Sequence, residues 1–562
     1  MTPLDFRNTN TLWCSVLAET LVRRGVAQVV ISPGSRSTPL TMALVQNEGI
    51  EAIPVLDERS AAFFALGLAK QTGKPVVLVC TSGTAGANYF PAVIEAHESG
   101  VPLIVITADR PPEMRDCASG QTIDQQKLFG GFVGFYHELA VPEASVTLLR
   151  YLRQTVAYAV ERAVAGGPVH LNAPFRDPLP PIADATAKGL AGEDWVKFFA
   201  HLDEASPAVK QTVAWSTQAT RSVIVAGPGA KAADVRALAK ATGWPVLADV
   251  LSPARHTTGE VVAAYDVILR NAELGRELTP EVVLCLGGWP TSKVLRGWME
   301  AGGAEIWLVA TGEANRDALH GRTRVIRAEV GALIVTAKPV NATYAQAWRE
   351  AEDMAAKLLA DGLKAEKAFV EPQVTSTLAA QLPKGTPVFV ANSMPVRDLE
   401  YFWPANARGV QVFFSRGANG IDGTLSTALG VAHGNAPTVL LTGDLALLHD
   451  TNGFLSVPQL RGSLTIVLVN NGGGGIFNHL PVAQFNPPFE KYWATPQSVD
   501  FAKLCAAYGV KHVVPKDIAH LSGLVSSLPA AGVRVLEVRT ERARDAAFRK
   551  TLFAEVAAGL AP

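Results

Sequence analysis

Two strand ends in the C-terminal third of the chain carry residue types that could bind a divalent cation beside a phosphate group. One apolar run ends in Gly443 and Asp444, and the next ends in Asn471 and the glycines at 472–475. A carboxylate, a carboxamide and a glycine-rich loop able to turn a carbonyl inward make an oxygen-only site, which suits Mg²⁺ or Ca²⁺ rather than zinc. The glycines also let backbone N–H groups approach a diphosphate closely.

The elements that must position these residues are strands of a parallel sheet. In open α/β sheets ligands bind beyond the carboxyl ends of the strands, so both polar tips are expected in one crevice. Taken alone, Asp444 fits an Asx turn followed by a flexible glycine loop. The matching tip at Asn471 favours a site for a metal and a diphosphate.

Two segments in the N-terminal third could also carry chemistry. Glu58 leads directly into an apolar helix, and the loop 32–39 follows a strand and offers Ser and Thr caps together with Arg36. Each also has an ordinary explanation, because helix dipoles favour acids in the first turn and Ser, Thr and Pro are common at helix starts. Neither motif defines a site by itself.

The middle of the chain holds a weaker motif. Gly227 begins a Gly-Pro-Gly-Ala-Lys-Ala turn after an apolar run, and Asp249 follows 22 positions later. This approximates a dinucleotide-binding fingerprint, although Pro228 and Ala232 weaken the match. The chain has no Gly-x-Ser-x-Gly elbow, Walker loop or HExxH motif, which excludes ordinary serine hydrolases, P-loop enzymes and zincins.

Composition narrows the class of protein further. The 562 residues are 48% hydrophobic and 18% charged, and the net charge is -1, so a packed multidomain protein is expected rather than a nucleic-acid binder. No run is long enough for a membrane span, and a cytoplasmic protein is expected. The five cysteines form no CxxC pair and are predicted to be reduced core residues; they are Cys14, Cys80, Cys117, Cys285 and Cys505.

Apolar runs alternate with helical segments in three successive α/β units, over about 10–175, 222–335 and 370–562. A Pro-rich passage and the polar residues after it predict a linker over 174–194. Helices are expected, among others, over 59–70, 87–98, 147–164 and 343–369. The fold class is therefore α/β, with three doubly wound parallel-sheet domains.

The first and third units resemble each other internally. Residues 81–110 and 441–471 both follow a plan of strand end, turn, helix, glycine and strand. Chance similarity between two βαβ units is the alternative. The favoured interpretation is a pair of similar α/β domains flanking a third.

With these motifs together, the chain resembles the decarboxylase-type thiamine diphosphate enzymes. The Gly443-Asp444 and Asn471 pair resembles their cofactor signature, although Leu445 stands where the wider superfamily has glycine. More narrowly, six segments resemble the MenD family, the 2-succinyl-5-enolpyruvyl-6-hydroxy-3-cyclohexene-1-carboxylate synthases of menaquinone biosynthesis; they are 32–39, 57–60, 81–84, 107–112, 416–423 and 471–477.

The resemblance implies a domain order and a reaction. The implied domains are a pyrimidine-binding domain at 1–182, a central α/β domain at 195–340 and a diphosphate- and magnesium-binding domain at 370–562. In the implied transferase reaction, 2-oxoglutarate is decarboxylated and the succinyl carbanion adds to isochorismate in a 1,4 sense. The implied cofactors are thiamine diphosphate and Mg²⁺, with Mn²⁺ as a substitute.

The resemblance also implies a role for each residue of this chain that matches a functional position of the family. Glu58 is the implied catalytic residue, contacting the aminopyrimidine ring. The implied metal ligands are Asp444, Asn471 and the Gly473 carbonyl. The other implied cofactor contacts are Ser393, Ile421, Gly443, Leu445, Ile476 and Phe477. The implied substrate contacts are Ser35, Arg36, Arg110, Gln121, Lys293, Ser393, Arg397, Arg416, Ile476 and Phe477.

One departure from the family pattern and two alternative functions remain open. Lys293 follows a serine where the family has a second basic residue, which leaves its role in doubt. An acetolactate-synthase-like enzyme with FAD in the central domain is the enzymatic alternative, and a non-catalytic regulator on the same scaffold is the other. The superfamily also implies a homo-oligomer, dimeric or tetrameric, with active sites between chains.

Overall fold

The computed structural model describes residues 2–206, 211–257, 260–311, 317–320 and 323–560. The chain divides into two compact units. The first comprises Met1–Ala208, Ser415–Asn435 and Ala446–Leu464, and the second comprises Val209–Phe414, Ala436–Leu445 and Thr465–Pro562. Two short segments of the predicted third domain therefore pack with the first unit. The domain bounds expected from the sequence stay predictions.

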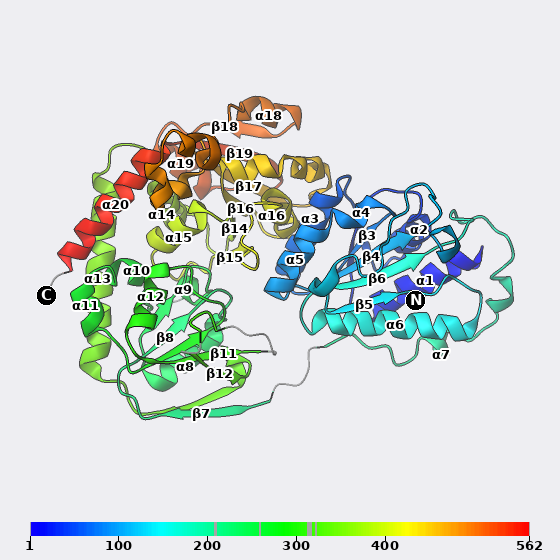
Figure 1. The fold of residues 1–562 in the computed structure, drawn as a ribbon, viewed down its shortest axis with the longest axis horizontal. Helices are drawn as coiled ribbons and strands as arrows, with labels where there is room; N and C mark the ends of the chain where they lie inside the picture. Colours follow the sequence, from blue (N-terminus) through cyan, green and yellow to red (C-terminus); the bar gives the residue numbers. More distant parts are fainter. Residues whose placement is uncertain (1, 207–210, 258–259, 312–316, 321–322, 561–562) are drawn as a thin grey trace. The chain divides into compact units, whose positions relative to one another are not determined.

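The N-terminal sheet has six parallel strands in the order β2-β1-β3-β4-β6-β5 (Figure 1, blue to cyan). Every residue of β3, β4 and β6 is buried, as expected for a parallel sheet covered by helices on both faces. The strands are β1 (Gln28–Ile31), β2 (Glu51–Pro54), β3 (Val76–Cys80), β4 (Leu103–Asp109), β5 (Phe135–Glu138) and β6 (Val169–Pro174). The main helices are α1 (Thr9–Arg23), α2 (Thr38–Gln46), α3 (Glu58–Thr72), α4 (Thr84–Ala87), α5 (Phe90–Ser99) and α6 (Val146–Val164).

The C-terminal sheet repeats this topology. Its order is β15-β14-β16-β17-β19-β18, which is the same order as in the N-terminal sheet when each set is numbered from its first strand. The strands are β14 (Pro387–Val390), β15 (Gln411–Phe414), β16 (Thr438–Gly443), β17 (Ser463–Asn470), β18 (Lys511–Val513) and β19 (Gly532–Arg539). The helices are α13 (Ala342–Ala365), α14 (Glu371–Gln381), α15 (Met394–Phe402), α16 (Thr424–Ala432), α17 (Asp444–His449), α18 (Phe501–Ala507), α19 (Ile518–Ser526) and α20 (Arg542–Gly559). The predicted internal resemblance is thus a repeated strand order.

The central sheet has the order β12-β11-β10-β8-β9, and β13 (Leu333–Ala337) pairs separately with β7 (Val213–Thr217). The five strands are β8 (Ser222–Ala226), β9 (Val246–Ala248), β10 (Val282–Leu286), β11 (Glu305–Ala310) and β12 (Thr323–Arg327). The helices around it include α8 (Ala232–Thr242), α9 (Ala254–Thr257), α10 (Tyr265–Ile268), α11 (Ala272–Glu277) and α12 (Lys293–Ala301). Three parallel sheets with interleaved helices confirm the predicted α/β class.

The dinucleotide-like motif of the central domain is explained by packing. Asp249 is fully buried, and its carboxylate accepts hydrogen bonds from the backbone N–H groups of Leu251 (2.8 Å) and Thr291 (2.6 Å). A Cβ on Gly227 would lie 1.9 Å from the Gly288 carbonyl oxygen. Packing between neighbouring loops therefore accounts for both Gly227 and Asp249. Since neither residue needs a bound dinucleotide to explain it, the motif weighs against the alternative of an FAD-binding enzyme.

Some local predictions need correction. The helix expected over 87–98 is interrupted, because α4 ends at Ala87 and α5 begins at Phe90, and the bridging helix ends at Ala365 rather than at 369. Cys117 is exposed, whereas the other four cysteines are buried.

The segment predicted to be a linker packs against α1 instead. The Asn8 side chain donates to the carbonyls of Pro180 (3.1 Å) and Ile182 (3.0 Å). Asn10 donates to the carbonyls of Arg176 (2.8 Å) and Pro178 (2.9 Å). Two side-chain amides on one helix therefore hold the Pro-rich chain in place.

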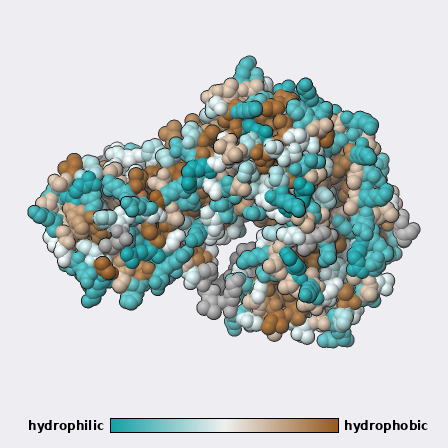
Figure 2. Space-filling model, turned by 180° about the vertical axis from the view of Figure 1, so that it is seen from behind, coloured by the Kyte–Doolittle hydropathy of each residue, from teal (hydrophilic) through white to brown (hydrophobic). Residues whose placement is uncertain are grey.

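None of the helices in the described part of the chain combines the length and the apolar character that crossing a bilayer requires. On the face that Figure 2 shows, hydrophobic residues form several separate groups among hydrophilic ones.

Helices α3 and α16 cross in close contact at a pair of glycines. A Cβ on Gly67 would lie 2.1 Å from the Thr427 carbonyl oxygen, and one on Gly430 would lie 2.0 Å from the Phe64 carbonyl oxygen. Side chains cannot be accommodated there without moving backbone. This crossing explains why α16 groups with the first compact unit.

We expect Gly67→Ala to destabilise the first unit, since the added methyl group must separate the two helices. Overpacking of this kind costs about 1–3 kcal/mol or more, which exceeds the gain of about 1 kcal/mol from alanine's helix propensity. Gly297→Ala is the matched control, because Gly297 is exposed within α12 and an added Cβ meets nothing within 4 Å. Urea unfolding followed by circular dichroism should move in opposite directions for the two variants; equal stability of Gly67→Ala and the unmodified protein would contradict the packing argument.

Candidate cofactor and substrate site

The two predicted metal-binding tips lie on adjacent strands. β16 ends at Gly443 and β17 at Asn470, and the two strands are neighbours in the sheet. Asp444 Oδ1 accepts a hydrogen bond from the Leu445 N–H (2.8 Å), and Oδ2 accepts one from the Gly473 N–H (2.8 Å). The structure thus brings Asp444 and Gly473 together, and their binding of a metal stays a prediction.

The electrostatics of these tips fit a divalent cation. Asp444 is buried, and this burial raises its pKa to about 6, with a further upward contribution from the charge of Glu371. The Asn471 Oδ1 atom is also buried and accepts no hydrogen bond from the described residues. A desolvated carboxylate and an unpaired carbonyl oxygen are both stabilised by a bound cation. The described residues hold no group of three or more His, Cys, Asp or Glu side chains suited to a metal, so a site here would use one carboxylate with amide and backbone oxygens.

One residue of the glycine loop at 472–475 must be glycine for steric reasons. Gly473 has φ +132°, and a Cβ there would lie 2.3 Å from the Ala494 carbonyl oxygen. The loop leads into the short helical turn η6 (Gly475–His479), which carries Ile476 and Phe477 in partly exposed positions. The chain can therefore turn sharply after Asn471 and present two apolar side chains.

Ser393 and Arg397 are brought together at the start of α15. Ser393 has φ +71° and precedes the helix, and Arg397 Nη1 donates to the Ser393 carbonyl oxygen (2.7 Å). Burial lowers the pKa of Arg397, and the positive charge of Arg296 on α12 lowers it as well. Two cations within electrostatic reach of each other suit an anionic ligand.

The structure gives less support for Lys293 as a ligand contact beside Arg397. It is exposed at the first turn of α12, just after the N-cap Ser292. Arg296, one turn further along, is the basic residue of this helix that acts on Arg397. Sequence reasoning missed Arg296, because no motif of the sequence singles it out.

A second cationic group forms in the first unit, at the ends of β1, β3 and β4. Arg36 is buried and donates to the Phe175 carbonyl oxygen (2.9 Å). Arg110 contacts the Ser82 hydroxyl, and Gln121 Nε2 donates to the Ser82 carbonyl oxygen (3.1 Å). Burial lowers the pKa of Arg110 and the charge of Arg36 adds to this effect, so the two guanidinium groups lie within electrostatic reach of each other.

Two serines, Ser35 and Ser82, also belong to this group of Arg36, Arg110 and Gln121. Ser35, in the same loop as Arg36, is exposed, and its carbonyl accepts from the Thr38 N–H (3.0 Å). Ser82 contacts both Arg110 and Gln121, a role that the motif at 81–84 does not by itself predict.

Glu58 is the first residue of α3 and is partly buried. The preceding Asp57 caps the helix by accepting from the Arg59 N–H (3.0 Å), and it also accepts from the Asn452 side chain (2.7 Å). Burial raises the pKa of the Cys80 thiol and the charge of Glu58 contributes, which places Glu58 near the end of β3. Since Asp57 already caps the helix, the carboxylate of Glu58 is not needed for that task.

Arg416 and Ile421 lie in the segment that precedes α16, and both are partly buried. Glu95 fixes this segment by accepting from the N–H groups of Gly417 (3.1 Å) and Ala418 (2.7 Å). The Ile421 carbonyl accepts from the Thr424 hydroxyl (2.8 Å). Hydrogen bonds to backbone groups therefore fix the segment that carries Arg416 and Ile421.

The predicted site residues form two sets. The first compact unit holds Ser35, Arg36, Glu58, Arg110, Gln121, Arg416 and Ile421. The second holds Lys293, Ser393, Arg397, Gly443, Asp444, Leu445, Asn471, Gly473, Ile476 and Phe477. Their meeting in one active site stays a prediction.

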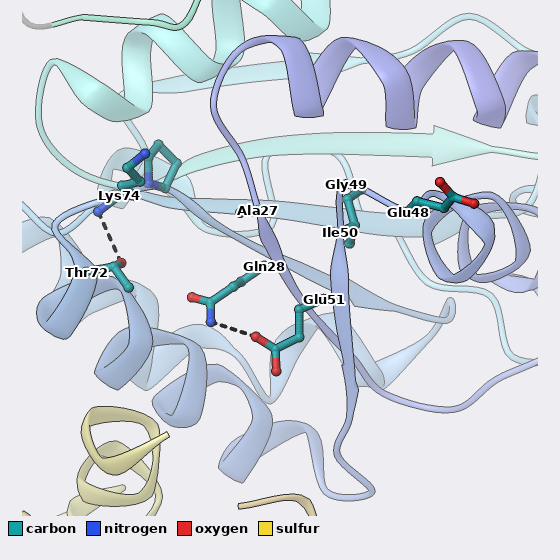
Figure 3. Close-up of a pocket in the computed structure, with 9 residues that line it drawn as sticks. Ala27, Gln28, Glu48, Gly49, Ile50, Glu51, Thr72 and Lys74 are labelled. Atoms are coloured by element: carbon teal, nitrogen blue, oxygen red, sulfur yellow. Dashed lines mark hydrogen bonds between the residues drawn. The ribbon is translucent and has the colours of Figure 1, made fainter. Parts of the chain in front are cut away.

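Two described cavities lie away from these residues. The cavity in Figure 3 has a volume of about 450 Å³, and its lining includes Glu48, Glu51 and Lys74. The second, of about 850 Å³, lies within the second unit, and much of its lining is apolar, including Leu359, Leu363 and Phe402. Neither cavity is lined by a predicted site residue.

Comparison with known domains defines the class of protein. Three models match in order along the chain: the N-terminal TPP binding domain of thiamine pyrophosphate enzymes over residues 14–128, their middle domain over 192–390, and their C-terminal TPP binding domain over 398–538. The chain is a thiamine pyrophosphate enzyme by these domains, which confirms the predicted class.

Full-length relatives define the family. The chain is 49% identical to the 2-succinyl-5-enolpyruvyl-6-hydroxy-3-cyclohexene-1-carboxylate synthase of Synechococcus elongatus, with 99% of this chain and 98% of the relative aligned. It is 47% identical to the enzymes of that name from Acaryochloris marina (98% and 99% aligned) and a Nostoc species (99% and 99% aligned). The chain belongs to this synthase family, the MenD family, as the motifs predict.

Proposed function

We propose that this chain is a thiamine-diphosphate-dependent transferase that decarboxylates 2-oxoglutarate and adds the remaining succinyl unit to isochorismate in a 1,4 sense. Its product would be 2-succinyl-5-enolpyruvyl-6-hydroxy-3-cyclohexene-1-carboxylate, in menaquinone biosynthesis. The observation that carries the proposal is 49% identity to a synthase of this name over nearly the whole of both chains. The oxygen-rich tips of β16 and β17 support it independently.

Asp444, the Asn471 carboxamide and the Gly473 carbonyl would hold Mg²⁺, or Mn²⁺ in its place, beside the diphosphate. Bound thiamine diphosphate supplies a nucleophilic carbon and an electron sink. Glu58 would exchange a proton with the aminopyrimidine ring, and Ile421, Gly443, Leu445, Ile476 and Phe477 would shape the space around the cofactor. The chain's own task is to orient the cofactor, hold its metal and place charges.

Both proposed substrates are dicarboxylates, so cations must converge on them. Ser393, Arg397 and Arg416 would contact 2-oxoglutarate, whereas Ser35, Arg36, Arg110 and Gln121 would contact isochorismate. The electrostatic repulsion between the guanidinium groups of Arg36 and Arg110 supports the second assignment, because a bound carboxylate would relieve it. Lys293 is the least supported contact.

The proposal includes the arrangement of the molecule. The domains would be bounded at 1–182, 195–340 and 370–562, and the enzyme would be a cytoplasmic homodimer or homotetramer with active sites between chains. Such an arrangement would let the site residues of the pyrimidine domain and those of the diphosphate domain come from different subunits. Light scattering of the purified protein tests the oligomeric state.

The reaction is tested by incubating the protein with 2-oxoglutarate, isochorismate, thiamine diphosphate and Mg²⁺ and identifying the products by mass. A succinylated ring product and CO₂ are expected. Acetolactate formed from pyruvate, without any succinylated ring product, would overturn the assignment.

The two substrates should depend on different arginines. We expect Arg397→Ala to slow CO₂ release from 2-oxoglutarate alone, and Arg416→Ala to do so to a smaller extent. Loss of one charge-assisted contact costs about 1.5–3 kcal/mol, or about 10- to 150-fold. Arg110→Ala should leave this single-turnover release near normal and raise the isochorismate concentration needed for ring product.

The control for this comparison is Arg349→Ala, because Arg349 lies exposed on α13 and has no proposed role. Both steps should be unchanged in that variant. If Arg110→Ala blocked CO₂ release while Arg397→Ala released it normally, the division of substrates would be reversed.

A further inference from the structure

The orientation of the Asn471 carboxamide is set by a buried carboxylate. Asn471 Nδ2 donates a hydrogen bond to Glu371 Oε1. An ionised carboxylate only accepts, so the amide nitrogen must face Glu371 and Oδ1 must face away from it. Oδ1 is the buried oxygen that accepts no hydrogen bond from the described residues.

Glu371 is itself fixed by the C-terminal helix. It is the first residue of α14 and is 2% exposed, and its other oxygen, Oε2, forms an ion pair with Arg549 of α20. Arg549 also donates from Nε and Nη2 to the two oxygens of Asp398 on α15 (2.7 and 2.5 Å). Each Glu371 oxygen therefore has one defined partner, and the carboxylate has little freedom to rotate.

Thr540, just before α20, and Arg542, the first residue of α20, hold the backbone on both sides of Asn471. The Thr540 N–H donates to the Asn470 carbonyl oxygen (3.0 Å), and Arg542 Nη1 donates to the Gly472 carbonyl oxygen (2.6 Å). Arg542 and Arg549 are seven residues apart and so lie on one face of the helix. Figure 1 shows α20 in red near α14 and α15 within the second unit.

We propose that Glu371, held by Arg549, is a positioning residue that keeps the Asn471 carboxamide oxygen directed toward the divalent cation. The inference rests on the proposed metal site at Asp444, Asn471 and Gly473. Without Glu371 the amide can rotate and present its NH₂ group, which repels a cation. Loss of a partner that orients a metal ligand typically costs about 10- to 100-fold in metal affinity.

The test measures Mn²⁺ binding by electron paramagnetic resonance in the full-length protein with saturating thiamine diphosphate. Glu371→Gln should weaken Mn²⁺ binding about 10- to 100-fold, because glutamine can donate as well as accept and no longer dictates the amide orientation. Glu371→Asp, which keeps the charge opposite Arg549 but shortens the side chain, should also weaken it and serves if the Gln variant does not fold. Glu400→Gln is the matched control: it alters another buried Arg–Glu contact, with Arg255 (3.3 Å), that does not touch Asn471.

A double variant separates positioning from general destabilisation. In the Asn471→Ala background, Glu371→Gln should produce no further loss of Mn²⁺ affinity, since the residue through which it acts is already absent. Unchanged Mn²⁺ affinity in both folded Glu371 variants, or an equal loss with and without Asn471, would overturn the inference. Failure of the unmodified protein to bind Mn²⁺ would instead overturn the proposed metal site, and the inference with it.

Discussion

Asp444→Ala should have no measurable affinity for thiamine diphosphate with Mg²⁺ at concentrations that saturate the unmodified protein, and no detectable synthase activity. Asp444 carries the only formal charge among the three proposed ligands, so its loss removes the electrostatic link between the diphosphate, the metal and the chain. Breaking a buried charge pair costs about 3–5 kcal/mol, or about 10²- to 10³-fold in affinity and more. The substitution also removes the acceptor for the Gly473 N–H, which frees the glycine loop. Titration calorimetry is the measurement.

Asp249→Ala is the matched control for this experiment. Asp249 also follows a strand, is buried and accepts hydrogen bonds from two backbone N–H groups, but it lies in the central domain. It should lower the melting temperature as Asp444→Ala does and leave cofactor affinity unchanged. Asn471→Ala should weaken cofactor binding less completely, because it removes a neutral ligand. Unchanged affinity in a folded Asp444→Ala variant would remove the basis for the metal assignment.

The sequence predicts the strand tips well because they are encoded locally. An apolar run followed by Gly443 and Asp444 specifies a buried parallel strand with a polar residue directly after it. The second tip, at Asn471, is encoded in the same way. The adjacency of the two strands follows from the βαβ connection between them. Both the tips and their pairing could thus be predicted without the structure.

The partners of these tips could not be predicted in this way. Glu371 lies 100 residues before Asn471, and at the first position of α14 it has the pattern of an ordinary first-turn acid. Arg549 lies in the middle of a helix rich in charged residues, where nothing local distinguishes it from solvated arginines. Their contacts depend on how α14, α15 and α20 pack, which is information spread over the whole C-terminal third of the chain.

Packing also explains why the segment of the predicted third domain that carries α16 groups with the first unit. A glycine inside a helix signals a close approach, and both Gly67 and Gly430 carry that signal. Which two glycines meet is decided only by the tertiary structure. The prediction of a linker over the Pro-rich passage from 174 to 181 was wrong for a similar reason. The residues that hold this passage, Asn8 and Asn10, lie more than 160 residues away in the sequence.

Glu58→Gln should bind thiamine diphosphate with nearly normal affinity and activate it very slowly. Glutamine keeps the shape of the side chain and a hydrogen bond to the aminopyrimidine ring, but it cannot exchange a proton with that ring. General acid–base groups contribute about 10²- to 10⁴-fold, and we expect exchange of the thiazolium carbon proton for deuterium to slow by that factor. The exchange can be followed by NMR after rapid quenching, and synthase activity should fall in parallel.

The competing explanation is that Glu58 only stabilises the start of α3, as first-turn acids commonly do. The structure weighs against it, since Asp57 already caps the helix through the Arg59 N–H and Glu58 is partly buried. Glu273→Gln provides the control, because Glu273 is an exposed first-turn acid of α11 with no proposed role. It should change neither exchange nor activity. If Glu58→Gln exchanged the proton as fast as the unmodified protein, the carboxylate would have no part in activating the cofactor, and a different residue of the active site would have to supply the base.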